Sequence, residues 1–467
     1  MLFSNLSFIF YFLPIVLGLY FIVPKPQKNW VLLAASLFFY FYGEPIYVFL
    51  MIGSIISGFL HGLWIERARN RQYAKLPLIS SIVTSVGMLG LFKYADFILH
   101  NLNLLFDANI SLLSLALPIG ISFYTFQILS YTIDVYRGDA KVQKSLIDFA
   151  TYVALFPQLV AGPIVRYTTV KEELKSRTHS FDNMANGIHR FVIGLSKKVL
   201  IADKLGEFGQ IFDQSDEKTI LFYWLFALAY MLQIYFDFSA YSDMGIGLGR
   251  MFGFHFCENF NYPFISKSIT EFWRRWHMSL GTWFRDYVYI PMGGNRVSKV
   301  KWVRNIFVVW LLTGIWHGAS WNFVVWGLFF ALVLFLEKVF IAKLLAKLPS
   351  ILRHCYVIFL LIISFVIFKG DGMTDAINHL RGMFGKLTIP LVGGETLYYL
   401  RSYAGLFLLA IIFSTPVADV LAKKIKSYGF GLKVANVLEP IAHLILMLLV
   451  IGYLVDGSFH PFLYFRF

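Results

Sequence analysis

The chain has 467 residues, of which 58% are hydrophobic and only 15% are charged, and its formal net charge is +14. This composition excludes an ordinary soluble enzyme and predicts a membrane protein. The excess lysine and arginine lies in short loops between apolar runs, where membrane topology accounts for it, so we expect no nucleic acid partner.

Long apolar runs recur along the whole chain and predict an all-α polytopic membrane protein. We expect about eleven spanning or re-entrant helices, because a span needs about 20 residues and several runs are shorter or broken. No internal repeat is visible, so we expect one continuous membrane domain over residues 1–467. The runs are 5–23, 46–64, 77–92, 111–133, 220–236, 305–336, 356–368, 404–413 and 440–454.

The first loops predict the topology. The first run follows "MLFSN", with no positive charge before it and no small-residue cleavage site after it, so we expect a membrane helix and not a signal peptide. "IERARNRQYAK" (65–75) is rich in arginine and is therefore expected in the cytosol. "PKPQK" (24–28) then also lies inside, and the loop 101–111, without lysine or arginine, lies outside.

The segment "FPQLVAGPIVRY" (156–167) departs from a plain spanning helix. Pro157, Gly162 and Pro163 interrupt an apolar run that is too short to cross twice. This pattern is typical of a re-entrant turn buried in protein, and an ordinary kinked helix fits it equally well.

The segment 234–250 ends an apolar helix with acidic groups and glycines. Asp237 and Asp243 would orient a histidine or an arginine, or only mark the membrane boundary. "GIGLGR" (245–250) has neither the preceding strand nor the lysine of a phosphate loop, so we interpret its glycines as close helix packing.

The segment 268–296 predicts an amphipathic helix at the cytosolic interface. Ser268 and Glu271 have the spacing of a capping box, and Pro291 begins the stop. An aromatic and aliphatic stripe recurs at helical spacing, with arginines off the stripe. The stripe is Trp276, Leu280, Trp283 and Tyr287.

His277 lies in this segment among cations. An interfacial histidine needs no chemical role, yet it is our second candidate for catalysis. The cations would bind an anionic cofactor such as the phosphates of coenzyme A, with lipid headgroups as the alternative ligand. They are Arg274, Arg275, Arg285, Arg296, Lys299 and Lys301.

His317 is the first candidate, in "WLLTGIWHGASWNFVVWG" (310–327), where no charged residue accompanies it. An ionisable group at membrane depth usually faces a bundle interior or a cavity. A neutral imidazole can take the proton of a hydroxyl that attacks a carbonyl, and Trp316, Trp321 and Trp326 would exclude water from it. The alternative is a histidine that is hydrogen-bonded to a backbone carbonyl or to Asn322.

The sequence predicts no metal site and no hydrolase triad. Cys257 and Cys355 lie far apart and lack metal-ligand spacing. No HExxH motif and no Ser, His and Asp set at a known spacing is present.

Two histidine blocks resemble the membrane-bound O-acyltransferases (MBOAT), specifically the bacterial branch typified by alginate O-acetylation. They are "YFDFSAYSDMGIGLGRMFGFHFCENFNYPFISKSITEFWRRWHMSLGTWFRDYVYIPMGGNR" (235–296) and "WLLTGIWHGASWNFVVWG". The segments 117–138 and 156–166 resemble this branch more weakly. The resemblance implies a ring of tilted helices around a central tunnel, with His317 as the catalytic histidine and His277 as the second characteristic polar residue.

The end of the chain, 455–467, predicts an aromatic tail. "PFLYFRF" would anchor in the headgroup layer or dock into a groove. A sharper hypothesis is that Tyr464, the only hydroxyl among these seven residues, accepts the acyl group and relays it to an outside partner. This ending also resembles the aromatic C-terminus of the branch.

From these patterns and this resemblance we expect a multi-pass O-acyltransferase of a bacterial inner membrane, in contact with membrane lipids. It would move acetyl from acetyl-CoA, with no bound cofactor, to an extracytoplasmic acyltransferase partner that modifies alginate, peptidoglycan or another polysaccharide. One alternative is D-alanyl or other acyl transfer from a carrier-protein thioester. Another is a polysaccharide or lipid transporter without covalent chemistry.

Overall fold

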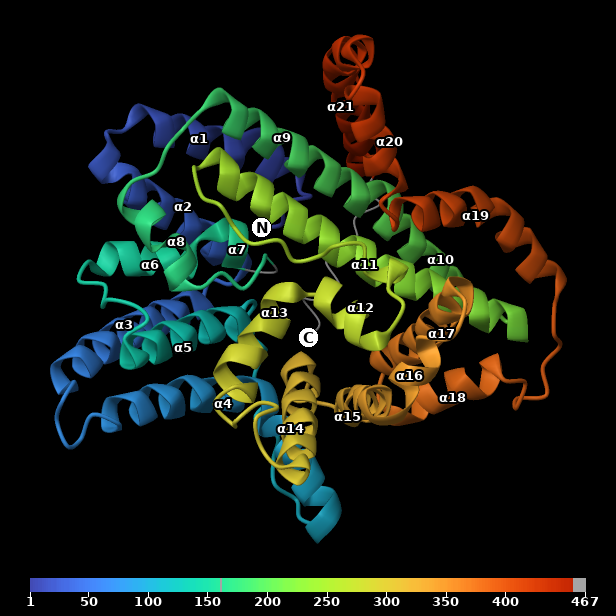
Figure 1. Ribbon diagram of the computed structural model, residues 1–467, viewed down its shortest axis with the longest axis horizontal. Coiled ribbons are helices and arrows are strands. Elements are labelled where there is room, and N and C mark those ends of the chain that lie inside the picture. The colour runs from blue at the N-terminus through green and yellow to red at the C-terminus, as the bar shows by residue number, and fades with distance from the viewer. Residues whose placement is uncertain (160–161, 457–467) are drawn as a thin grey trace. The chain divides into compact units, whose positions relative to one another are not determined.

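The computed structural model describes residues 1–159 and 162–456, which form helices and loops without a strand (Figure 1). Seven helices within these ranges are long and apolar enough to cross a membrane, and Phe8–Ile22 is a shorter apolar stretch. The prediction of an all-α polytopic membrane protein is therefore confirmed, whereas the number of about eleven spans stays a prediction.

The chain divides into two compact units. The first comprises Met1–Phe191 and Ser242–Glu258, and the second comprises Val192–Tyr241 and Asn259–Phe467. The helices α9 (Phe181–Ser196) and α11 (Ile220–Met251) contribute to both units. The single membrane domain expected over 1–467 stays a prediction.

The first unit is built around α5, in which 14 of the 17 residues are buried, including its polar groups Gln127, Ser130 and Thr132. α3 and α4 pack against it, and the three helices lie side by side (Figure 1). A helix that is buried all round needs partners on every side, which explains why α5 shows no exposed polar face. The helices are α1 (Leu13–Ile22), α2 (Lys28–Gly43), α3 (Tyr47–Ala68), α4 (Leu76–Phe106), α5 (Ile121–Arg137), α6 (Leu146–Ala154), α7 (Phe156–Leu159) and α8 (Tyr167–Lys175).

The chain around Pro157 is broken and buried. α6 ends at Ala154, the short α7 follows, and residues 163–166 have no regular structure, although all of these residues are shielded from solvent or nearly so. A continuous kinked helix is therefore not seen in the described part of 156–167. Buried irregular backbone agrees with the re-entrant alternative, while its depth in a membrane stays a prediction.

The glycines of α11 pack against neighbouring backbone, as the sequence predicted. A Cβ on Gly245 would lie 2.5 Å from the carbonyl oxygen of Pro157, and one on Gly247 would lie 2.6 Å from that of Gly187. No larger residue fits at either place without displacing backbone. "GIGLGR" is thus a helix-packing motif.

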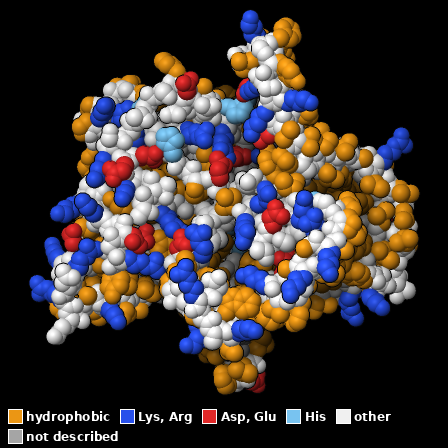
Figure 2. All heavy atoms as spheres, in the orientation of Figure 1, with side chains coloured by type: hydrophobic (Ala, Val, Ile, Leu, Met, Phe, Trp, Pro, Cys, Tyr) orange, Lys and Arg blue, Asp and Glu red, His pale blue; other side chains and the backbone are white. Residues whose placement is uncertain are grey.

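The second unit contains both candidate histidines, His277 and His317. It also exposes a large apolar surface over α19, where hydrophobic side chains gather in Figure 2. The exposed side chains of α19 include Leu397, Leu408 and Leu409. Such a patch is unusual in a soluble protein and suits contact with lipid. Its helices are α10 (Asp203–Gln214), α12 (Ile269–Arg275), α13 (Met278–Phe284), α14 (Lys299–His317), α15 (Trp321–Leu336), α16 (Ala342–Leu345), α17 (Ser350–Lys369), α18 (Met373–Met383), α19 (Gly394–Phe413), α20 (Val417–Lys426) and α21 (Gly429–Val455).

Candidate functional site

His317 lies at the turn of a helical hairpin. The apolar run 305–336 is not one span: α14 ends at His317, and α15 begins at Trp321. The two helices cross at Gly314 and Gly327, where a Cβ on Gly327 would meet the carbonyl oxygen of Trp310 at 2.4 Å. This contact at backbone distance fixes the last turn of α14 against the start of α15, and so it positions the imidazole.

Aromatic rings surround the His317 imidazole, which is 3% exposed. Its ring centroid lies 5.0 Å from that of Trp316, 5.0 Å from that of Trp326 and 5.2 Å from that of Phe368, each in edge-to-face geometry. Trp321, which we expected to shield this histidine, is 53% exposed. Phe368, at the end of α17, takes its place in the described structure.

Asn322 holds the end of α17 and not the imidazole. Its Nδ2 donates to the carbonyl oxygens of Phe368 (3.3 Å) and Gly370 (2.9 Å). Its Oδ1 accepts no hydrogen bond from any residue that the structure describes. The alternative in which Asn322 binds His317 is therefore not seen, and Asn322 instead positions Phe368.

His277 lies in a break between two short helices. The single helix expected over 268–296 is divided into α12, α13 and a π-helical turn, Arg285–Tyr289. The chain turns at His277, whose φ of 44° is in the left-handed region that non-glycine residues seldom adopt. The predicted stripe is nevertheless buried, because Trp276, Leu280 and Trp283 are each at most 5% exposed. The cytosolic position of this segment stays a prediction.

Asn259 fixes the tautomer of His277. Its Oδ1 accepts from the backbone N–H of Ser279 (3.2 Å) and from the Ser279 hydroxyl (2.9 Å), which identifies this atom as the oxygen. It lies 3.2 Å from Nδ1 of His277, so Nδ1 carries the hydrogen. Nε2 then holds a lone pair and has no hydrogen-bond partner within the described ranges.

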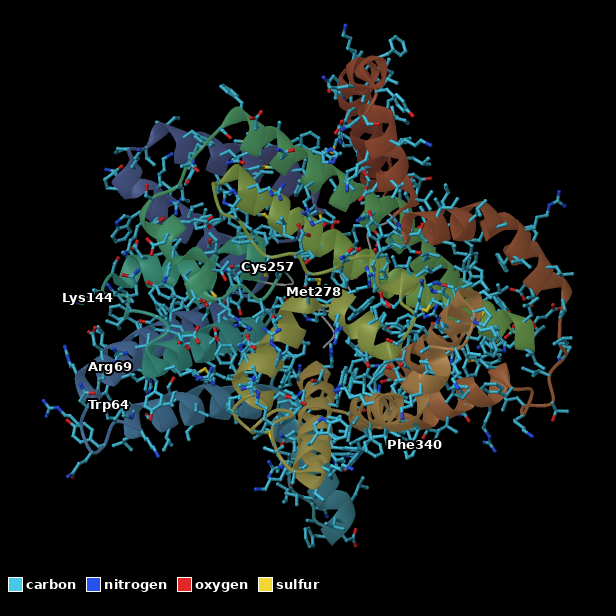
Figure 3. All side chains as sticks on the ribbon, in the orientation of Figure 1. Trp64, Arg69, Lys144, Cys257, Met278 and Phe340 are labelled. Atoms are coloured by element: carbon cyan, nitrogen blue, oxygen red, sulfur yellow. The ribbon has the colours of Figure 1, made fainter. Side chains whose placement is uncertain are left out.

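The His277 ring is buried and neutral. It is 2% exposed and lies edge-on to Phe238, at 4.6 Å between centroids. Burial lowers the pKa of His277 to about 3, so the imidazole stays uncharged near neutral pH. The ring of Trp316 lies 6.1 Å away, and Trp316 therefore contacts both candidate histidines. Met278, labelled in Figure 3, marks the start of α13 beside this site.

Three residues hold the start of α12. The Ser268 hydroxyl accepts from the N–H of Glu271, so the predicted cap is confirmed, and the Glu271 carboxylate accepts from Lys267. Glu337, 2% exposed, accepts from the N–H groups of Ile269 (2.6 Å) and Thr270 (2.9 Å). A carboxylate at a helix N-terminus satisfies free N–H groups and the helix dipole. Glu337 follows α15, so it ties this helix to α12.

The predicted arginine cluster is only partly available for an anion. Arg275 forms an ion pair with Glu271 at 3.0 Å, and Arg285 forms one with Asp286 at 2.6 Å. Arg274 and Arg296 are exposed. Two of the four predicted arginines thus have a carboxylate partner, and their role in binding an anionic cofactor stays a prediction.

A different pocket lies near this region. It has a volume of about 530 Å³, and its lining includes Lys299, Trp302 and Lys338. The Lys338 ammonium lies 5.7 Å from the centroid of the Trp302 ring. Lys299 was among the predicted cations, whereas Lys338 follows an apolar helix and gave no signal in the sequence.

Asp237 and Asp243 do not mark a helix end, because α11 continues to Met251, and both aspartates bind cations. Within the first unit, Asp243 accepts from Arg190 at 2.8 Å. Within the second, Asp237 and Asp203 each lie 2.7 Å from the ammonium of Lys198. Of the alternatives left open by the sequence, an acidic partner for a cation is the one seen, although for Asp237 that cation is a lysine.

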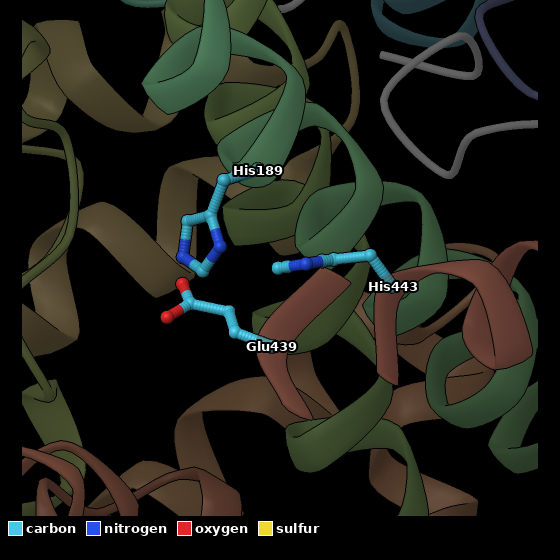
Figure 4. A group of neighbouring side chains, drawn as sticks. All are labelled: His189, Glu439 and His443. Carbon is cyan, nitrogen blue, oxygen red and sulfur yellow. The ribbon is translucent and has the colours of Figure 1, made fainter. Parts of the chain in front are cut away.

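Neither the predicted Tyr464 nor the group of side chains in Figure 4 is part of the site described above. Tyr464 lies outside the described residues. Glu439 and His443 lie one turn apart on α21 (Figure 4), and the Glu439 carboxylate forms an ion pair with Lys426 of α20 at 2.6 Å. Figure 4 also draws His189, a residue of the first unit. Glu439 is thus accounted for by its contact with α20.

Sequence reasoning missed Asn259, Glu337 and Phe368. Asn259 lies in a loop without periodicity, and Glu337 looks like a boundary charge after an apolar helix. Phe368 is one of many apolar residues in α17. Only the two histidines carried a signal of their own, because imidazoles are rare in apolar sequence.

Comparison with known proteins agrees with the geometry. Residues 139–368, which include both histidines, match the model of the MBOAT, membrane-bound O-acyltransferase family. The probable alginate O-acetylase AlgI of Pseudomonas aeruginosa is 43% identical over 389 residues, or 82% of this chain and 75% of that protein. The peptidoglycan O-acetyltransferase of Helicobacter pylori is 35% identical over 87% of this chain and 83% of its own length. The teichoic acid D-alanyltransferase of Bacillus subtilis is 34% identical over 47% of this chain and 60% of its own length.

Proposed function

Because this chain belongs to the membrane-bound O-acyltransferase family, we propose that it moves acetyl from cytosolic acetyl-CoA across the membrane for O-acetylation of an extracytoplasmic polysaccharide. This proposal starts from two established points, the multi-pass helical structure and the O-acyltransferase class. The donor, the direction of transfer, the bacterial inner membrane and an extracytoplasmic acyltransferase partner are the parts we propose.

The observation that carries the proposed chemistry is the enclosure of His317 at the α14–α15 turn. Indole and phenyl rings at 5.0–5.2 Å exclude bulk water from the imidazole. In such a site, a proton that the imidazole takes from a hydroxyl does not exchange with solvent before the reaction is complete. We therefore assign His317 as the general base.

The proposed reaction moves the acetyl group from a thioester, the donor, to a hydroxyl group, which becomes an oxygen ester. The acceptor hydroxyl oxygen attacks the thioester carbonyl carbon while the imidazole takes the hydroxyl proton. The carbon–sulfur bond then breaks, and the coenzyme A sulfur leaves with that proton as a free thiol. His277, with its hydrogen on Nδ1 and its lone pair on Nε2, would accept a hydrogen bond from a substrate N–H or O–H.

The share of this chain that aligns with each relative favours acetyl over D-alanyl as the transferred group. The two relatives named for O-acetylation align with 82% and 87% of this chain, and the one named for D-alanyl transfer aligns with 47%. The acceptor is an alginate-like polymer, peptidoglycan or another polysaccharide. D-alanyl transfer from a carrier-protein thioester is the second candidate.

The test uses the purified chain in liposomes with labelled acetyl-CoA supplied on one side. Acetyl transfer to an acceptor polysaccharide and release of free coenzyme A thiol are measured together. We expect thiol release that depends on His317, with a His317→Gln variant as the control. Movement of polysaccharide without thiol release would instead identify a transporter.

A further inference from the structure

A basic pocket lies in the first unit, away from both histidines in sequence. Its volume is about 630 Å³. The loop between α1 and α2, the start of α2, the end of α8 and residues 176–179 form its walls. Its ionisable lining residues are Lys25, Lys28, Asp148, Lys175, Arg177 and His179.

The charge of this pocket is unbalanced. Asp148 is its single carboxylate, and Oδ1 of Asp148 accepts from the Asn29 amide at 2.7 Å. None of its four lysine and arginine side chains forms an ion pair with a residue that the structure describes. Clustered cations without counter-charge repel one another, so an anion in the pocket would relieve that repulsion.

Neighbouring residues fix the orientation of the Arg177 guanidinium and leave one of its nitrogen atoms available. Tyr20 donates its hydroxyl hydrogen to the Phe252 carbonyl at 2.8 Å, so its oxygen accepts from Nε of Arg177 at 2.9 Å. Nη1 donates to the Glu173 carbonyl, and the guanidinium lies over the ring of Phe254. Nη2 donates to no described residue, so its two N–H groups remain for an anion.

Lys28 and His179 complete the basic wall. The Lys28 ammonium lies 4.4 Å above the centroid of the Tyr20 ring. Burial lowers the pKa of Lys28, and repulsion from Arg177 and Lys25 lowers this pKa further. Burial also lowers the pKa of His179, with the same cations and Lys28 adding to the effect against a backbone hydrogen bond at Thr178. Repulsion among these cations adds to the effect of burial, which agrees with the unbalanced charge of the pocket.

We propose that this pocket binds the phosphate group of an anionic phospholipid. Arginine presents a planar fork to phosphate oxygens, and lysines add point charges. Large apolar side chains border the pocket in sequence and are exposed: Phe21 by 43%, Ile22 by 81% and Trp30 by 59%. A lipid supplies both the phosphate and the acyl chains for these surfaces, whereas a soluble phosphate ester supplies only the phosphate. The predicted cytosolic position of 24–28 would face the anionic leaflet.

The test measures binding of radiolabelled dihexanoyl phosphatidylglycerol to the purified full-length chain in an uncharged detergent. The double variant Lys25→Gln/Lys28→Gln is expected to bind it roughly tenfold more weakly or worse, since it removes two of the four lysine and arginine side chains that line the pocket. Lys144→Gln is the matched control, because Lys144, labelled in Figure 3, is an exposed lysine of the same unit and is not among the residues that line the pocket. Its affinity should stay within about twofold, since a charge outside the pocket is screened.

Three comparisons decide the source of the phosphate. Dihexanoyl phosphatidylcholine should bind much more weakly than phosphatidylglycerol. Inorganic phosphate and adenosine 3′,5′-bisphosphate should displace the lipid only at higher concentration. Tighter binding of the bisphosphate than of the lipid would assign the pocket to a soluble ester and overturn the lipid proposal. Unchanged lipid affinity in the folded double variant would remove the pocket as the binding site altogether.

Discussion

Gly314 and Gly327 face each other across the crossing of α14 and α15, where a Cβ on either glycine would lie 3.1–3.2 Å from the Cα of the other. The same added atom would come within 2.4 Å of a backbone carbonyl oxygen on the facing helix. The helices therefore approach as closely as backbones allow, and the turn that carries His317 depends on this approach.

Gly327→Leu should force the hairpin apart. We expect a loss of about 1–3 kcal/mol or more in the free energy of unfolding, because the new side chain has no space. Thermal unfolding in detergent measures this loss. Gly405→Ala on α19 is the matched control, because nothing lies within 4 Å of its added Cβ. A melting temperature unchanged in Gly327→Leu would contradict the close crossing.

His317→Gln should abolish acyl transfer while the chain still folds. Glutamine preserves polarity and approximate size but cannot take a proton, so we expect a loss of about 10²-fold or more in rate. Acetyl transfer per folded molecule in liposomes is the measurement. Trp321→Phe, at an exposed position beside the turn, should keep most of the activity. Near-normal transfer by His317→Gln would refute the assignment as base.

His277 should make stability depend on pH in a defined window. The folded chain keeps this imidazole neutral down to about pH 3, whereas the unfolded chain protonates it below its ordinary pKa of 6.5. Stability is thus fully present above pH 6.5 and falls as the pH decreases toward 3, by about 1.4 kcal/mol per unit from this group. Unfolding of the wild type and His277→Gln at several pH values measures the difference in slope. Equal slopes would show that His277 does not titrate this way.

Replacing Lys198 should lower the free energy of unfolding more than replacing either of its two carboxylate partners. One ammonium serves two carboxylates at 2.7 Å, and the side chains are at most 5% exposed. Lys198→Met leaves two buried carboxylates without a counter-charge, with an expected loss of about 3–5 kcal/mol. Asp203→Asn leaves one cation with one carboxylate, and burial already raises the pKa of Asp203, so its loss should be smaller. Unfolding measurements that gave the reverse order would contradict this charge balance.

Tyr464→Phe separates the two hypotheses for the C-terminal tail. The ring is kept and the hydroxyl is lost, so an anchor should work as before. Under the relay hypothesis the variant expresses normally but fails to acetylate the polysaccharide. Mass spectrometry of the C-terminal peptide should detect an acetyl adduct in the wild type only. Full activity of the variant would leave the anchor.

The sequence predicted the class of fold and the two histidines for different reasons. Apolar runs of membrane length predict helices whatever they pack against, and an imidazole in such a run stands out. The break at His277 could not be predicted, because the local pattern from Ser268 onward is helical, whereas the left-handed turn is stabilised by tertiary hydrogen bonds such as those of Asn259. Nor could Phe368 be chosen over Trp321, since which ring reaches His317 depends on how α17 packs against α15.

The contacts of Glu337 have a mechanical consequence. α15 starts just after His317 and is followed by Glu337, which accepts hydrogen bonds from the first residues of α12, and α12 leads to His277. The ring of His277 in turn contacts Trp316, the neighbour of His317. These contacts close a ring of connected elements, and a closed ring has fewer degrees of freedom than an open chain of the same elements. The distance between the two imidazoles is therefore constrained twice, through α15, Glu337 and α12 and through Trp316. If one of these two connections is weakened, the other still maintains the distance.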